Sequence, residues 1–133
     1  ASDVYKRQGG EAVVLAGVTD PVAGIMGKEE PDISKALKDA PENGVRILVS
    51  HQPRLAREAA AHGVDLQVSG HTHGGMIAGV DRLVARFNEG FVSGLYTVGN
   101  MKLYVSNGAG IWNGFPIRIG VPSEIVLIRL RKE

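Results

Sequence analysis

Short apolar runs separated by turn-forming residues dominate the first half of the chain. Residues 11–18 (EAVVLAGV), 45–50 (VRILVS) and 64–70 (VDLQVSG) are rich in β-branched side chains, which predicts three strands. The run at 45–50 is almost continuously apolar, so we expect that strand to be buried on both faces.

Two segments between these runs have helical spacing and helix-end signals. In residues 53–63 (PRLAREAAAHG), Pro53 suits the first helical position and Gly63 the position just past the end. A second helix is predicted over residues 32–40, with Asp32 as its N-cap and Pro41 closing it. The resulting βαβαβ order predicts that strands 45–50 and 66–69 are parallel neighbours joined by a right-handed crossover.

The pattern changes after Gly79. Residues 94–108 (GLYTVGNMKLYVSNG) predict a β-hairpin that turns at GNMK, and residues 123–133 (SEIVLIRLRKE) predict a last strand. The chain is therefore expected to be an α/β fold in which βαβαβ is followed by a β-meander. Residues 1–8 (ASDVYKRQ) show neither period and are expected to be a non-native leader or a disordered terminus, which leaves residues 9–133 as the domain.

Composition removes several classes of function. The 133 residues correspond to about one domain, and a net charge of +1 gives no electrostatic reason to expect nucleic acid as a partner. The absence of cysteine excludes disulfides, thiolate metal sites and cysteine nucleophiles. No apolar run approaches the roughly 18 residues that a membrane span needs.

Three of the four histidines are placed for shared chemistry. His51 and His71 each follow the carboxyl end of a predicted strand, and His73 is next but one in a glycine-bounded loop. Ligands of open α/β sheets bind at that edge, so parallel neighbouring strands would bring His51 and His71 to the same edge. The fourth, His62, lies near a helix end, where it interacts with the helix dipole, and it is given no catalytic role.

The histidines allow more than one interpretation. One alternative is that the H-x-H pair consists of hydrogen-bonding loop residues that bind no metal. Another is that the three histidines form a mononuclear metal site with one open position. The third histidine and the surrounding glycines favour metal binding, for which neutral imidazole suits Zn, Mn, Fe or Ni. Thr72 is expected to orient the loop by hydrogen bonding. Gly70, Gly74 and Gly75 are expected to let the backbone turn and to leave space for ions and substrate.

Three stretches together resemble the C-terminal half of the calcineurin-like metallophosphoesterases, in their bacterial phosphodiesterase-like branch. They are ILVSHQP, AAAHGVDLQVSGHTHGGMI and LYVSNGAGIWNGFPIRIGVPSEIVLIRL, and the resemblance runs from about Gly17 to Leu130. It implies the C-terminal half of a four-layer αββα sandwich with two divalent metal ions. By this resemblance His51 and His71 share one metal, His73 binds the other, and the ions activate a hydroxide that hydrolyses a phosphomonoester or phosphodiester.

The chain also departs from this family. Met76 stands where many relatives carry glutamine, which affects substrate contacts. The family's upstream D-x-H, G-D-x-x-D/N and G-N-H-D/E motifs do not occur, so the catalytic residues are unknown. We therefore expect a fragment with an incomplete site that is inactive by itself; the alternative is a degenerate, non-catalytic metal-binding or scaffold relative.

Three further expectations concern single residues and location. Asp20 is interpreted as a turn residue or a group behind the metal ligands. Arg118 is interpreted as loop support rather than a phosphate contact. Cytoplasmic and membrane-associated locations both stay open, with membrane association only through an upstream segment.

Overall fold

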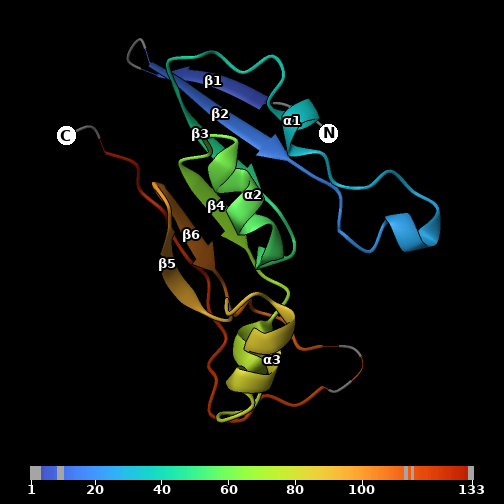
Figure 1. The fold of residues 1–133 in the computed structure, drawn as a ribbon. Helices are drawn as coiled ribbons and strands as arrows, with labels where there is room; N and C mark the ends of the chain where they lie inside the picture. Colours follow the sequence, from blue (N-terminus) through green and yellow to red (C-terminus); the bar gives the residue numbers. More distant parts are fainter. Residues whose placement is uncertain (1–3, 9–10, 113, 115, 132–133) are drawn as a thin grey trace.

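The computed structural model describes residues 4–8, 11–112, 114 and 116–131. One six-stranded sheet forms its centre, in the order β1-β2-β3-β4-β6-β5 (Figure 1). Strands β2, β3, β4 and β6 are mutually parallel, whereas the two outer strands are antiparallel to their neighbours. Their bounds are Val4–Gln8 (β1), Glu11–Gly17 (β2), Gly44–Val49 (β3), Leu66–Ser69 (β4), Gly94–Val98 (β5) and Met101–Val105 (β6).

The helices are short. They are α1 (Ile33–Ala36), α2 (Ala56–Ala61) and α3 (Asp81–Phe87), with 3-10 turns at Gly24–Met26, Pro53–Leu55 and His73–Gly75. The predicted N-cap of α1 and the predicted end of α2 are confirmed, whereas α1 ends at Ala36, short of the Pro41 that was expected to close it. The Asp32 carboxylate caps α1 by accepting a hydrogen bond from the Lys35 N–H at 2.8 Å, and Gly63 follows α2 in the left-handed region at φ 72°.

Both βαβ crossovers place their helices on one face of the sheet, where the core forms. Right-handed crossovers that advance in the same direction have this result. The parallel pairing of β3 with β4 confirms the predicted unit. The buried side chains of this core are Ala16, Ile33, Ala36, Leu48, Ala56, Ala59, Val64, Phe91, Met101, Leu103 and Val105.

The opposite face of the sheet is open within the described residues, contrary to one prediction. Strand β3 was expected to be buried on both faces, but Val45 and Val49 are exposed while Leu48 is fully buried. Leu15 on β2 and Leu95 on β5 are also exposed. A continuous apolar run predicts two covered faces, and here α1 and α2 cover only one.

Three other predictions about elements are corrected. Val4–Gln8 pairs with β2 as strand β1, where no regular element was expected; Ala1–Asp3 lie outside the described residues, and the non-native origin of this segment stays a prediction. Helix α3 was missed. Residues 123–131 form no strand, and 132–133 lie outside the described residues. The alternating pattern of this last segment lacks a pairing neighbour, so Ile125 is 93% exposed and Leu127 is 77% exposed.

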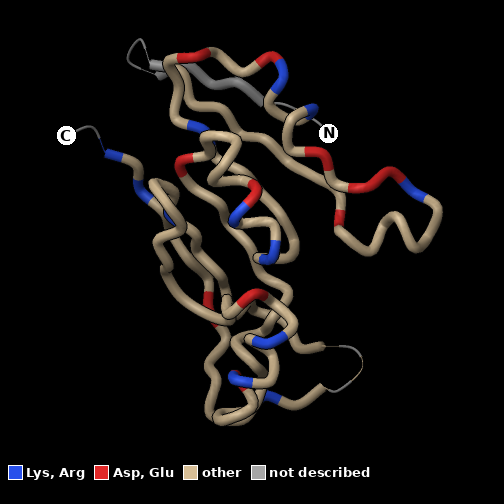
Figure 2. Tube along the Cα trace, viewed as in Figure 1, with Lys and Arg blue, Asp and Glu red and all other residues tan. Residues whose placement is uncertain are grey.

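The mixed α/β sheet with few helices agrees with a part of the expected sandwich. The predicted hairpin is present, because β5 and β6 pair antiparallel across Gly99 and Asn100. Figure 2 shows Lys and Arg interspersed with Asp and Glu along the trace. Among the described residues, no helix has the length and apolar character that crossing a membrane requires.

Candidate metal centre

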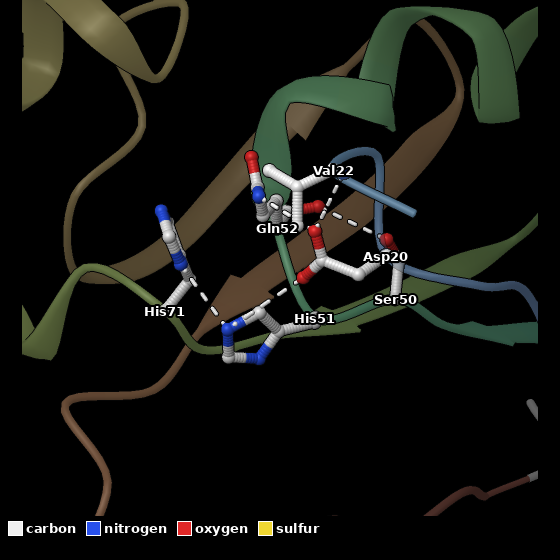
Figure 3. Close-up of polar contacts among 6 residues, drawn as sticks. All are labelled: Asp20, Val22, Ser50, His51, Gln52 and His71. Carbon is white, nitrogen blue, oxygen red and sulfur yellow. Dashed lines mark hydrogen bonds and ion pairs between the residues drawn. The ribbon is translucent and has the colours of Figure 1, made fainter. Parts of the chain in front are cut away.

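The parallel pairing of β3 and β4 brings His51 and His71 together. The ladder continues past both strands: Ser50 N–H donates to the Val68 carbonyl at 3.1 Å, and Gly70 N–H donates to the His51 carbonyl at 3.1 Å. The two imidazoles therefore meet at the carboxyl edge of the sheet, as the sequence predicted. His51 Nε2 lies 3.1 Å from His71 Nδ1 (Figure 3).

The separation of these nitrogens agrees with two of the interpretations. One nitrogen can donate a hydrogen bond to the other if it carries the proton. Alternatively, both nitrogens can bind the same ion. At bond lengths of about 2.0–2.1 Å, as for zinc, they would then lie roughly 2.9–3.4 Å apart for octahedral to tetrahedral angles. Other features of the site must therefore distinguish a hydrogen-bonded pair from a pair of metal ligands.

Burial lowers the pKa of His71, and its neighbour His51 lowers it further. The neutral form of His71 therefore persists below the ordinary value of 6.5. Neutral imidazole is the form that binds a metal ion. A neutral His71 also avoids placing two protonated rings in contact.

Asp20 adds a carboxylate beside His51 (Figure 3). Its Oδ1 accepts hydrogen bonds from the Val22 N–H and from Gln52 Nε2, both at 2.9 Å. Its Oδ2 lies 3.8 Å from His51 Nε2. The Val22 contact is the turn role expected for Asp20, and the second oxygen places negative charge on the side of His51 that faces His71.

The loop that carries His71 and His73 is held in a strained backbone. Within the described residues, four non-glycine residues have positive φ, and three lie in this loop: His71 at 70°, His73 at 49° and Met76 at 61°. Such conformations cost on the order of 1–3 kcal/mol each and cluster at functional sites. His73 Nδ1 is also buried without a hydrogen-bond partner. A buried imidazole nitrogen without a hydrogen-bond partner fits the role of a metal ligand.

Neighbouring groups hold this loop in place. Thr72 donates a hydrogen bond to the Val92 carbonyl, which confirms its orienting role. Arg118 donates to backbone carbonyls at His73 (3.3 Å) and at Asn107 (3.0 Å). Arg118 also donates to the carbonyls of Gly110 and Pro122. These contacts agree with the expected role of Arg118 in loop support.

The loop glycines make room for protein rather than for ions. A Cβ on Gly74 would lie 2.7 Å from Val121 Cγ1 and would also collide with the Asn107 amide. A Cβ on Gly75 would lie 2.9 Å from Asp81 Cα. The positive φ of both glycines confirms the predicted turn, but protein atoms occupy the space that was expected to be left for ions and substrate.

Among the described side chains, the three histidines do not make up a complete metal-binding group. Across the residues that the structure describes, no three or more His, Cys, Asp or Glu side chains form a group that could hold an ion by themselves. The facing nitrogens of His51 and His71, and the unpartnered nitrogen of His73, fit partial sets of metal ligands. Their metal role stays a prediction, and so does the dinuclear arrangement.

Comparison with known proteins identifies the class. No protein-family model matches the chain, and no solved structure shows significant similarity to it. An uncharacterized metallophosphoesterase of Campylobacter jejuni is 42% identical over 118 residues, which are 88% of this chain and 31% of that protein. One from Helicobacter pylori is 43% identical over 87% of this chain and 31% of its own length. One from Aquifex aeolicus is 34% identical over 92% of this chain and 49% of its own length.

These similarities support the assignment to the calcineurin-like metallophosphoesterase family that the motifs predicted. The family implies a hydrolase that uses divalent metal ions. The chain spans about a third of the length of the Campylobacter and Helicobacter relatives.

Proposed function

We propose that this chain supplies metal-binding histidines to a metal-dependent phosphoesterase that hydrolyses phosphomonoesters or phosphodiesters. The observation that carries this proposal is the 3.1 Å approach of His51 Nε2 to His71 Nδ1 at the carboxyl edge of two parallel strands. His51 and His71 would hold one ion, and His73 would hold a second. The family assignment supports the phosphate-ester substrate.

Two bound divalent ions would supply Lewis-acid activation of water and neutralisation of charge on the phosphoryl oxygens. Residues of this chain provide the neutral imidazole, the negative charge and the backbone position that metal binding requires. The depressed pKa of His71 keeps that ring neutral, and the Asp20 carboxylate adds negative charge that favours cations beside His51. Arg118 fixes the backbone at His73 through its carbonyl. We infer that further ligands and the catalytic residues come from outside this segment.

The test compares this chain with the full-length gene product that contains it, using bis-p-nitrophenyl phosphate and Mn²⁺. The longer protein should hydrolyse the ester, and this chain should be far slower. In the longer protein, replacing His51, His71 or His73 by alanine should weaken Mn²⁺ binding by at least about 100-fold, because even groups behind a ligand contribute about 10–100-fold. The matched control is His62→Ala, since His62 is exposed on the helix end and remote from this edge.

Calorimetric stoichiometry separates the alternatives. Two ions per chain are expected, and one ion would favour the mononuclear site. Uptake of metal without hydrolysis of any phosphate ester would favour the degenerate scaffold relative. Unchanged Mn²⁺ affinity in all three histidine variants would exclude the proposed site.

A further inference from the structure

A pocket adjoins the histidine loop on the side of helix α3. His71, Thr72 and His73 form one wall, Met76, Val84 and Asn88 form another, and Trp112 borders it from the segment after β6. We call it the Trp112 pocket. Because His71 and His73 line it, a group bound there lies directly beside the proposed metal centre.

Apolar side chains at this pocket are left uncovered within the described residues. Met76 and Val84 are partly exposed, and Trp112 is 51% exposed. No residue of α3 is buried, and its apolar residues Leu83 and Phe87 are exposed. Clustered apolar surface beside polar groups is typical of a ligand site. The indole offers a flat face on which a ring can stack.

Asn88, which lines this pocket, carries a buried amide oxygen that has no hydrogen-bond partner. Asn88 is 5% exposed, and its Nδ2 donates to the Val84 carbonyl at 3.0 Å. That bond fixes the orientation of the amide, and it leaves Oδ1 buried with no partner. A buried carbonyl oxygen without a donor is unfavourable by about 1–3 kcal/mol. A ligand that brings an N–H or O–H group would satisfy it.

We propose that the Trp112 pocket binds the organic group of the phosphate ester, and that this group carries a flat ring and a hydrogen-bond donor. The ring stacks on Trp112 and packs on Met76 and Val84, and the donor reaches Asn88 Oδ1. This inference rests on the proposed phosphoesterase function, because the phosphate would be bound by the metal ions that the histidines would hold beside the pocket. It adds the substrate class, which the three histidines alone leave open.

The test uses two esters with the same leaving group, thymidine 5′-p-nitrophenyl phosphate and methyl p-nitrophenyl phosphate, on the Mn²⁺-loaded full-length protein. Thymidine brings a ring and N–H and O–H donors, and methyl brings neither. Stacking of one base on an aromatic side chain corresponds to at least about a fivefold effect on binding. We expect the KM of the thymidine ester to be at least about fivefold lower than that of the methyl ester.

Substitutions assign this difference to the pocket. Trp112→Ala should raise KM for the thymidine ester about fivefold or more and leave KM for the methyl ester unchanged. Ile25→Ala, a change at another exposed apolar residue, should alter neither constant. Equal KM values for both esters in the unmodified protein, or an equal effect of Trp112→Ala on both, would overturn the proposal.

A binding measurement keeps this inference separate from the proposed function. Trp112 is the only tryptophan of the 133 residues, so its fluorescence in this chain reports on the pocket alone. Thymidine 5′-monophosphate should change the emission and methyl phosphate should not. If neither ester is hydrolysed but this change occurs, the phosphoesterase proposal fails while the pocket still binds a ring. If hydrolysis occurs but thymidine 5′-monophosphate leaves the emission unchanged, the pocket proposal fails.

Discussion

Replacing Gly74 by alanine tests whether tight packing holds the histidine loop in place. Gly74 has φ 65°, and an added Cβ would lie 2.7 Å from Val121 Cγ1 and would collide with the Asn107 amide. The Asn107 Oδ1 already accepts a hydrogen bond from Ser93 Oγ at 2.7 Å, so it cannot move away freely. The substitution therefore forces either the loop or its neighbour to shift.

Gly27 provides a matched control for Gly74. Its φ is 68°, and nothing lies within 4 Å of the added Cβ. Alanine in the left-handed region costs about 1–2 kcal/mol at either position. Gly74→Ala should lose a further ~1–3 kcal/mol through overpacking.

Urea unfolding measures the difference in the free energy of unfolding between these two variants. Calorimetry should show weaker Mn²⁺ binding only for Gly74→Ala, because Gly74 follows His73 directly. Equal losses of stability in both variants, with unchanged Mn²⁺ affinity, would refute the argument that close packing positions this histidine.

Two further predictions concern the same loop. Arg118→Met should lower the free energy of unfolding by about 1.5–3 kcal/mol, because it removes charged hydrogen bonds to carbonyls that include those of His73 and Asn107. Arg118→Lys should not restore this stability, because lysine lacks the planar guanidinium group. Unchanged stability with a raised KM would instead make Arg118 a substrate contact. The pKa of His71 is lowered by burial and then by His51. The contribution of this residue to the stability of the metal-free protein should therefore be present above about pH 6.5, and it should be lost as the pH falls from there through the pKa of the folded state. An NMR titration midpoint at or above 6.5 for this imidazole would contradict that sign.

Local signals in the sequence predicted the elements that depend on local chemistry. Asp32 caps α1, Pro53 begins a helical turn and Gly63 ends α2, because each satisfies a backbone requirement within a few residues. The two strands that carry His51 and His71 were predicted for a related reason, since a short helix between parallel strands leaves few possible arrangements. Helix α3 was missed although Leu83, Val84 and Phe87 have helical spacing; none of its residues is buried in the structure.

Short-range patterns were sufficient to predict the βαβαβ order, the meeting of two histidines at one sheet edge, and the similarity to metallophosphoesterases. These follow from periodicity, turn chemistry and motif spacing, which act over short stretches of chain. Three features became clear only in the folded chain: one sheet face is covered, residues 123–131 pair with no strand, and Gly74 makes room for Asn107. Each of them depends on partners that are distant in the chain, and no local pattern specifies such partners.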